Sequence, residues 1–186
     1  MQSRILLIGM MGVGKTTVGS MVADRLGWTY LDSDAEIIRT TGMTVPEIFE
    51  RRGEAAFRAE ESRVLAAAAT SEFPVVVAVA GGACREPDNR RRVRRGGLVV
   101  WLRAEVEVLA RRVGRGDGRP LLGDDPLAAL RRLYPERRAS YERLADAVID
   151  VDHLTPAEVT DRVVARWNQR RAGQRRHAVR SAGAPA

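Results

Sequence analysis

The chain has 186 residues, of which 45% are hydrophobic and 30% are charged, and its formal net charge is +7. This length and composition are typical of one globular domain with a sizeable core, and they exclude a fibrous or wholly disordered chain. No run is apolar enough to span a bilayer, no signal-peptide pattern is present, and the single cysteine, Cys84, excludes an internal disulfide, so we expect a cytoplasmic protein without a membrane partner.

A phosphate-binding motif lies close to the start of the chain. The apolar run Arg4-Ile5-Leu6-Leu7-Ile8 predicts a buried parallel strand. The next residues, from Gly9 to Thr16, fit G-x-x-x-x-G-K-[ST], in which backbone N–H groups surround phosphate oxygens. Lys15 is the only lysine among 31 basic side chains, and a compact ammonium fits between phosphate oxygens where a planar guanidinium does not. A helix predicted over 16–26 adds the positive end of its dipole, so the segment predicts a nucleoside triphosphate site.

Strand and helix signals then alternate to the end of the domain, which indicates an α/β fold with a parallel sheet. The further predicted strands are Thr29–Leu31, Val75–Val79, Leu98–Leu102 and Ala147–Val151. The further predicted helices are 33–41, 45–52, 54–70, 87–95, 105–113, 126–143 and 155–167. Because one crossover needs only one helix, we interpret the polar helices at about 33–61 as a substrate-binding insertion.

Two segments do not have the pattern of a packed core. The glycine-rich stretch at about 114–125 has few large apolar groups and predicts a mobile lid. The segment 168–186 has five arginines and no acid, and we interpret it as a disordered basic tail that follows a domain of residues 1–167. Since most of the excess charge lies in this tail, we expect no specific nucleic-acid partner.

Polar and small residues follow two of the predicted strands, at the edge where open parallel sheets bind ligands. Asp32 and Asp34 follow the second strand, and one carboxylate would hold Mg²⁺ through water while the other orients or deprotonates an attacking hydroxyl. Either one could instead cap the next helix. Gly81 and Gly82 follow the third strand and would let a ligand approach bare backbone, with a tight turn as the alternative.

Three arginines are candidates for binding anions. Arg58 and Glu61 lie three residues apart on one helical face, so the carboxylate can orient the guanidinium for bidentate binding of a substrate carboxylate. A surface salt bridge is the alternative interpretation. Arg119 in the lid is suited to neutralise a transferring phosphoryl group, and Arg137 adds a second cation for an acidic substrate.

Together these residues resemble the shikimate kinase family over residues 4–167. The motifs that carry the resemblance are Gly9-Met10-Met11-Gly12-Val13-Gly14-Lys15-Thr16-Thr17, Asp32-Ser33-Asp34, Gly42-Met43-Thr44-Val45-Pro46-Glu47-Ile48-Phe49, Gly53-Glu54 with Phe57-Arg58-x-x-Glu61, and Arg119-Pro120-Leu121-Leu122. The resemblance implies ATP- and Mg²⁺-dependent phosphorylation of the 3-hydroxyl of shikimate to shikimate 3-phosphate, on the route to chorismate and the aromatic amino acids. It also implies a three-layer P-loop kinase fold with a five-stranded parallel sheet in the order 2-3-1-4-5, a lid and a substrate-binding insertion. We expect a monomer.

The resemblance implies catalytic roles for Lys15, Asp34 and Arg119. Lys15 and Arg119 would stabilise the transferring phosphoryl group. Asp34 would bind the ring hydroxyls of shikimate and act as the base. Thr16 and Asp32 would hold Mg²⁺.

The resemblance also implies which residues bind the two substrates. Arg58 and Arg137, with the backbone at Gly81 and Gly82, would bind the carboxylate of shikimate. Arg112 would pack on adenine. The implied ATP-binding residues are Gly12, Val13, Gly14, Lys15, Thr16, Thr17, Arg112 and Arg119.

The chain departs from the family pattern at two places, which leaves alternatives open. Ala80 stands where the family usually has a glycine, and Ala139-Ser140 stands before Tyr141 where Pro-Leu is frequent. Arg138 is therefore the alternative to Arg137. The alternative functions are a kinase of another small hydroxy acid such as gluconate, or a non-catalytic ATP-binding regulator.

Overall fold

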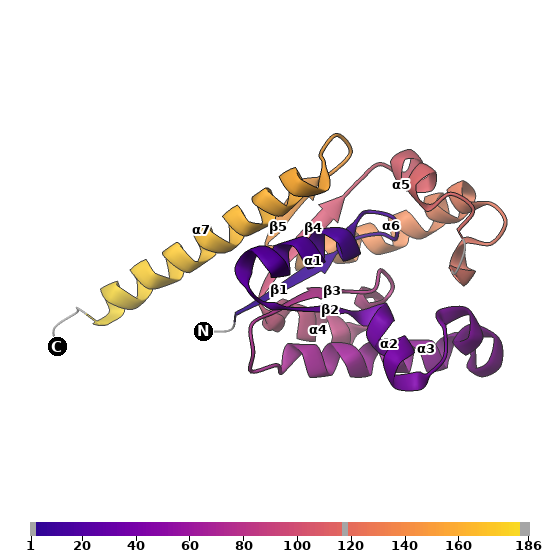
Figure 1. Cartoon of the computed structure of the whole chain (residues 1–186), viewed down its shortest axis with the longest axis horizontal. Helices are drawn as coiled ribbons and strands as arrows, with labels where there is room; N and C mark the ends of the chain where they lie inside the picture. Colours follow the sequence, from indigo (N-terminus) through magenta and orange to yellow (C-terminus); the bar gives the residue numbers. More distant parts are fainter. Residues whose placement is uncertain (1–2, 117–118, 183–186) are drawn as a thin grey trace.

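A parallel sheet forms the centre of the molecule in the computed structural model, which describes residues 3–116 and 119–182, with the side chains of the last helix to Arg176 (Figure 1). Its strands are β1 (Arg4–Ile8), β2 (Thr29–Asp32), β3 (Val75–Ala78), β4 (Leu98–Arg103) and β5 (Ala147–Asp150). They pair in parallel in the order β2-β3-β1-β4-β5, which confirms the predicted sheet. Each strand boundary lies within one residue of its predicted position.

Helices pack on both sides of this sheet. They are α1 (Lys15–Leu26), α2 (Ser33–Thr41), α3 (Val45–Ala69), α4 (Pro87–Gly96), α5 (Val106–Val113), α6 (Pro126–Leu144) and α7 (Pro156–Ala182), with short 3-10 helices η1 (Ala83–Arg85) and η2 (Pro120–Leu122). Helix α1 lies against α7, while α3 lies against α4, which also contacts α6. Within the described part of the chain, no helix has the length and apolar character needed to cross a membrane.

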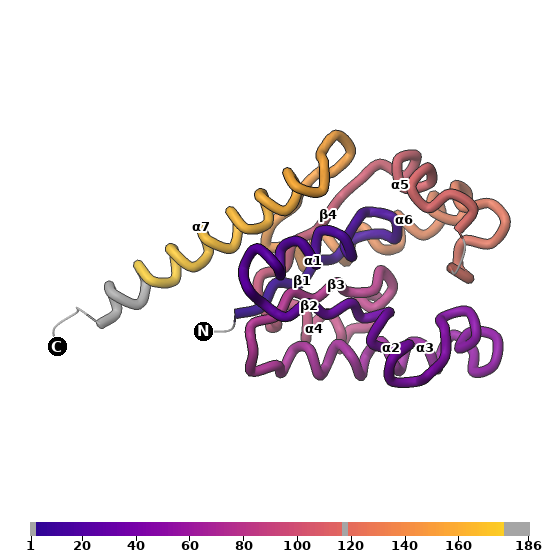
Figure 2. The backbone as a smooth tube through the Cα atoms, in the orientation of Figure 1, coloured from indigo at the N-terminus to yellow at the C-terminus, as the bar shows by residue number. Residues whose placement is uncertain are grey.

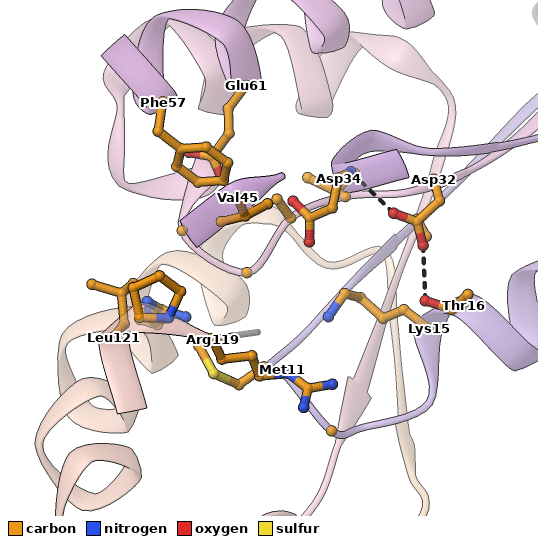
Figure 3. A pocket seen from close by; sticks show the side chains of 18 of the residues that line it. Met11, Lys15, Thr16, Asp32, Asp34, Val45, Phe57, Glu61, Arg119 and Leu121 are labelled. Carbon is orange, nitrogen blue, oxygen red and sulfur yellow. Dashed lines mark hydrogen bonds between the residues drawn. The ribbon is translucent and has the colours of Figure 1, made fainter. Parts of the chain in front are cut away.

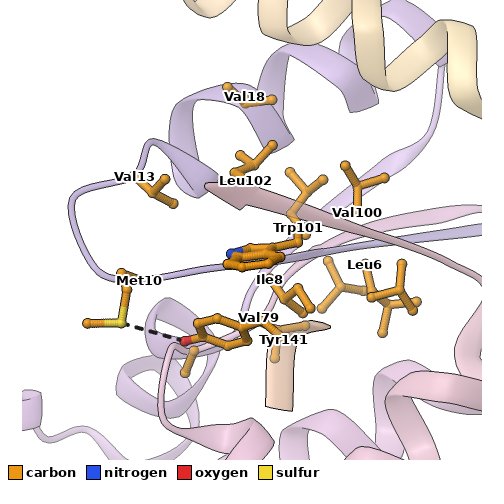
Figure 4. Packing of buried hydrophobic residues seen from close by; sticks show 14 of the residues in the cluster. Leu6, Ile8, Met10, Val13, Val18, Val79, Val100, Trp101, Leu102 and Tyr141 are labelled. Carbon is orange, nitrogen blue, oxygen red and sulfur yellow. Dashed lines mark hydrogen bonds between the residues drawn. The ribbon is translucent and has the colours of Figure 1, made fainter. Parts of the chain in front are cut away.

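The central strands are continuous apolar runs because both of their faces are covered. All five residues of β1 are buried, and β1 pairs with β3 on one side and β4 on the other. Trp101 of β4 packs on Tyr141 of α6 with ring centroids 5.8 Å apart (Figure 4). This packing fixes the carboxyl ends of β1, β3 and β4 and the segments that follow them.

Helix α2 and the first two thirds of α3 cover residues 33–61, the segment predicted to be a substrate-binding insertion. Thr44 and Glu47 form a reciprocal capping box at the start of α3. Gly53 has φ 78° and ψ 169°, so it interrupts α3 where two separate helices, 45–52 and 54–70, were predicted. Ile37, Ile48, Phe57 and Val64 form a small core between α2 and α3.

The prediction of a disordered tail over 168–186 was wrong for the part of it that the structure describes. Helix α7 continues to Ala182, while residues 183–186 lie outside the described residues. The coloured part of this helix already extends past the rest of the molecule (Figure 2). Up to Trp167, the helix contributes buried side chains to the core.

Contacts near the predicted end of α7 explain why the helix continues. Trp167 meets Trp28 edge to face at 4.9 Å, and Arg170 Nη1 lies 2.9 Å from Asp146 Oδ2. A helix anchored in this way has already overcome its nucleation cost, and the Ala, Arg and Gln residues that follow favour its extension. The composition of residues 168–186 predicted disorder because composition alone does not report the contacts of Trp167 and Arg170 with the rest of the domain.

Candidate active site

A pocket of about 310 Å³ lies at the carboxyl ends of β1, β2 and β3 (Figure 3). Its walls come from the loop before α1, the β2–α2 junction, α3, the turn after β3, η2 and α6. Most of the predicted site residues line it, namely Gly12, Gly14, Lys15, Thr16, Thr17, Asp32, Asp34, Arg58, Gly81, Gly82, Arg119 and Arg137. Segments far apart in sequence therefore meet at one edge of the sheet, as expected for an open parallel sheet.

The phosphate loop, residues 9–16, joins β1 to α1 and keeps its backbone bare. Gly12 and Gly14 have φ values of 79° and 99°, which favour glycine. A Cβ atom on Gly12 would lie only 2.6 Å from Cγ1 of Val113, so this position also requires a residue without a side chain. Val13 turns its side chain into the core, where it is 2% exposed. The loop thus has the conformation that a cradle for phosphate needs.

Lys15 is held by the phosphate loop itself. Its Nζ donates to the carbonyl oxygens of Gly9 at 2.9 Å and Met10 at 3.0 Å. Burial lowers the pKa of Lys15 to about 8, and the nearby carboxylates of Asp34 and Asp32 oppose this shift. Phosphate oxygens beside this ammonium group would favour its charged form and oppose the effect of burial.

Asp32 has two functions in the structure. Its Oδ1 accepts from the backbone N–H of Asp34 at 3.0 Å and of Ala35 at 3.4 Å, so it is the N-cap of α2. Its Oδ2 accepts from the hydroxyl of Thr16 at 2.8 Å. The capping alternative therefore holds for Asp32, and the same carboxylate also joins β2 to the phosphate loop.

Asp34 extends into the pocket and faces Lys15 (Figure 3). Burial raises the pKa of Asp34, the neighbouring charge of Asp32 adds to the increase, and Lys15, Arg58 and Arg119 oppose it. A carboxylate with a raised pKa beside cations is suited to accept a proton from a bound hydroxyl.

Arg58 is fixed by two carboxylates of its own helix. Its Nη1 lies 2.6 Å from Glu61 Oε2, and its Nη2 lies 2.7 Å from Glu54 Oε1. The side chain of Arg58 is 13% exposed and that of Glu61 1%, so this pair is not the surface salt bridge of the alternative interpretation. Burial raises the pKa of Glu61 to about 7, although Arg58 opposes the increase. A Cβ atom on Gly82 would overlap the guanidinium of Arg58, so the glycine makes room for it.

Arg137 is buried and has no partner among the described residues. It is 1% exposed, and its Nε, Nη1 and Nη2 atoms all lack a hydrogen-bond partner there. Arg138 is exposed on the same helix and pairs with Glu142 at 2.7 Å. The structure therefore brings Arg137 and not Arg138 to the pocket. A buried guanidinium without a partner is costly and favours the binding of an anion.

The two remaining predicted arginines differ in position. Arg119 lines the pocket next to Pro120 and Leu121 of η2, and residues 117–118 of the predicted lid lie outside the described residues. Arg112 does not line this pocket, and its Nη2 donates to the carbonyl oxygen of Val151 at 3.0 Å. Its predicted contact with adenine is therefore not tested by the geometry of the pocket.

Sequence reasoning did not assign the apolar lining of the pocket. It comes from Met11, Val45, Phe49, Phe57, Pro120 and Leu121. The sequence contained the signal, because all six of these residues belong to the quoted motifs and two of them are aromatic. Such a wall can exclude water and hold the carbon ring of a small polar substrate.

The oxygen atoms at the β2–α1 side of the pocket fit a magnesium ion that binds together with a nucleotide. Among the described residues there is no group of three or more His, Cys, Asp or Glu side chains that could hold a metal alone. The hydroxyl of Thr16 and the carboxylate of Asp32 lie 2.8 Å apart, and both are hard oxygen ligands. Magnesium is commonly bound by one or two such groups plus substrate phosphates.

Comparisons with known proteins agree with this geometry. The family pattern described as shikimate kinase matches residues 11–168. The chain is 46% identical to a shikimate kinase of Ruegeria pomeroyi over 162 residues, which are 87% of this chain and 83% of that protein. It is 43% identical to a shikimate kinase of Thiobacillus denitrificans, over 86% of this chain and 87% of that protein. Among solved structures, shikimate kinase from Acinetobacter baumannii in complex with shikimate has a TM-score of 0.87 and 37% identity, covering 90% of this chain and 94% of that one.

Proposed function

The chain belongs to the shikimate kinase family and is an enzyme that phosphorylates shikimate with ATP, and we propose how its residues divide this reaction. The observation that carries the assignment is the buried guanidinium of Arg137. It lies in the pocket that also contains Lys15 and Asp34, and it has no hydrogen-bond partner in the part of the chain that the structure describes. One end of this pocket thus favours phosphate and the other favours a carboxylate.

The carboxylate of shikimate binds between Arg137 and Arg58. Arg58 is already paired with Glu61 and Glu54, whereas the guanidinium of Arg137 has no hydrogen-bond partner among the described residues. A substrate with one carboxylate supplies the missing negative charge, and the planar guanidinium can bind it through two hydrogen bonds. The turn at Gly81 and Gly82 allows the carboxylate to approach the backbone.

ATP binds through the phosphate loop. The backbone of residues 12–17 surrounds the β- and γ-phosphates, and Lys15 exchanges its contacts with the Gly9 and Met10 carbonyls for contacts with phosphate oxygens. Arg112 packs on the adenine ring. Thr16 and Asp32 would hold Mg²⁺, which would neutralise negative charge on the phosphates of ATP.

The 3-hydroxyl oxygen of shikimate attacks the γ-phosphorus of ATP, the bond from this phosphorus to the β–γ bridging oxygen breaks, and ADP leaves. Asp34 accepts the hydroxyl proton as the oxygen attacks, and its raised pKa makes it a better proton acceptor than an ordinary aspartate. Lys15 and Arg119 neutralise the charge that spreads over the phosphoryl oxygens. We assign residues 1–167 to the kinase domain, about 33–61 to the substrate-binding insertion and about 114–125 to a lid that carries Arg119 over the site.

The test is ADP release from Mg²⁺-ATP with the purified protein. Shikimate, gluconate, AMP and no acceptor are compared, with Lys15→Ala as the inactive control. Release that requires shikimate and is lost in Lys15→Ala supports the proposal. Release with gluconate but not with shikimate would contradict the acceptor, and ATP binding without release for any acceptor would favour a regulator. Light scattering of the same sample tests the expected monomer, and cell fractionation tests the expected cytoplasmic location.

A further inference from the structure

The turn after β3, residues 80–82, is held from two sides by buried hydroxyl groups that have no role in the reaction described above. The backbone N–H of Ala80 donates to Oγ of Ser33 at 2.8 Å. Oη of Tyr141 donates to the carbonyl oxygen of Gly81 at 2.6 Å. Both hydroxyls come from elements distant in sequence, α2 and α6.

The hydroxyl of Ser33 replaces a missing strand partner. Strand β3 pairs with β2 in parallel up to Asp32↔Ala78, and the N–H of Val79 donates to Leu7 of β1 on the other side. Because successive N–H groups along a strand point to opposite neighbours, the N–H of Ala80 points toward β2. There the chain has already turned into α2, and Ser33 (3% exposed) supplies the acceptor that the backbone no longer provides.

The hydroxyl of Tyr141 links α6 to the same turn. Tyr141 is fully buried, its ring packs on Trp101, and its hydroxyl lies 4.0 Å from Sδ of Met10 (Figure 4). Burial raises the pKa of this phenol, so the group stays protonated and can donate. Among the described residues, the carbonyl oxygen of Gly81 is the oxygen that accepts this hydrogen bond, at 2.6 Å.

Tyr141 and Arg137 reach the turn together. They are four residues apart on α6 and therefore share one face of the helix. A Cβ atom on Gly81 would lie 3.0 Å from Nη1 of Arg137 and 3.5 Å from Oη of Tyr141. The phenol thus fixes the backbone of Gly81 at the point where the guanidinium approaches it.

We propose that Ser33 and Tyr141 are positioning residues, whose hydroxyls set the distance between the glycine turn and the two arginines that bind the substrate carboxylate. The inference rests on the proposed function, because it assigns the carboxylate to Arg58 and Arg137. Glycines at 81 and 82 leave the turn without side chains to pack, so its backbone would be free to move without these two hydrogen bonds. A small displacement of a binding group has a large effect on affinity and orientation.

The experiment removes each hydroxyl with little change of shape. Tyr141→Phe and Ser33→Ala each raise the KM for shikimate about tenfold, which corresponds to about 1.4 kcal/mol, while kcat and the KM for ATP stay within about twofold. Ser33→Thr keeps a hydroxyl at the same position and restores a KM close to that of the wild type. Tyr134→Phe and Ser140→Ala are matched controls on α6 that lie outside the pocket and leave both KM values unchanged.

The possible failures are distinguishable. If the wild type does not phosphorylate shikimate, the proposed function fails. If it does, and both hydroxyl variants keep the wild-type KM for shikimate, only this inference fails. A parallel rise in both KM values with a lower melting temperature would show a purely structural role and would also overturn it. If Ser33→Thr behaves as Ser33→Ala, the role of Ser33 is refuted, and Tyr141→Phe decides the role of the phenol by itself.

Discussion

Replacing Arg137 by methionine is expected to make the free protein more stable and a much poorer enzyme. The guanidinium is 1% exposed and its three nitrogen atoms have no partner among the described residues. Methionine has a similar length and no charge, so Arg137→Met removes an uncompensated buried cation. Replacing buried charged groups by apolar ones of similar volume stabilises proteins by about 1–4 kcal/mol.

The same substitution removes the main partner of the substrate carboxylate. Loss of a bidentate, charge-assisted contact of this kind costs about 2–4 kcal/mol, which is roughly a 30- to 700-fold increase in the KM for shikimate. The KM for ATP should change by less than about threefold, because the phosphate loop is built from other residues.

Two measurements separate these effects. Urea or thermal unfolding gives the stability, and each kcal/mol is expected to shift the melting temperature by about 2–4 °C for a chain of this size. Adding shikimate should raise the melting temperature of the wild type but not that of Arg137→Met. Arg138→Met is the matched control, since Arg138 is exposed and pairs with Glu142, and it should leave stability and both KM values nearly unchanged.

A destabilised Arg137→Met protein that keeps its KM for shikimate would refute this reasoning. It would mean that the guanidinium is satisfied in solution, for example by water, and that it does not bind the substrate.

Three further predictions follow from the site. Asp34→Asn should lower kcat at least about 100-fold through loss of the base, while calorimetry shows ATP binding within about threefold of the wild type; an equal loss of both would contradict its role. Since the pKa of Glu61 rises from 4.5 in the unfolded chain to about 7 in the folded protein, the folded protein binds more protons between these values, and its stability should fall as the pH rises from 4.5 to 7. In Glu61→Gln this decline, followed by urea unfolding at several pH values, should be smaller, and an unchanged slope would contradict the burial argument. Deleting residues 171–186 should leave kcat and both KM values within about twofold, because the described part of this segment does not line the pocket; a larger change would assign it a role in the reaction.

Most of the architecture could be predicted from the sequence because its signals are local. The apolar run of Arg4–Ile8, the glycine pattern of the phosphate loop and the helix-start signals each depend on a few neighbouring residues. The strand boundaries were therefore correct to within one residue. The end of α7 was not, because it depends on the contact of Trp167 with Trp28, which are far apart in sequence.

The pocket residues also fall into those that a local sequence pattern specifies and those that only tertiary contacts specify. The sequence pattern alone identified the phosphate loop, Asp32, Asp34 and the pairing of Arg58 with Glu61, since a motif or a helical spacing specifies each of them.

Only the tertiary structure separated Arg137 from its neighbour Arg138, and only it revealed the hydroxyls of Ser33 and Tyr141. Thirty of the 31 Lys and Arg residues are arginines, and no local pattern decides between the adjacent Arg137 and Arg138. Their environments differ because adjacent residues on a helix point about 100° apart, so the packing of α6 against the turn after β3 buries one guanidinium and leaves the next in water. The hydrogen bond from the N–H of Ala80 to the hydroxyl of Ser33 likewise depends on where β2 ends beside β3. These two segments are more than forty residues apart in sequence.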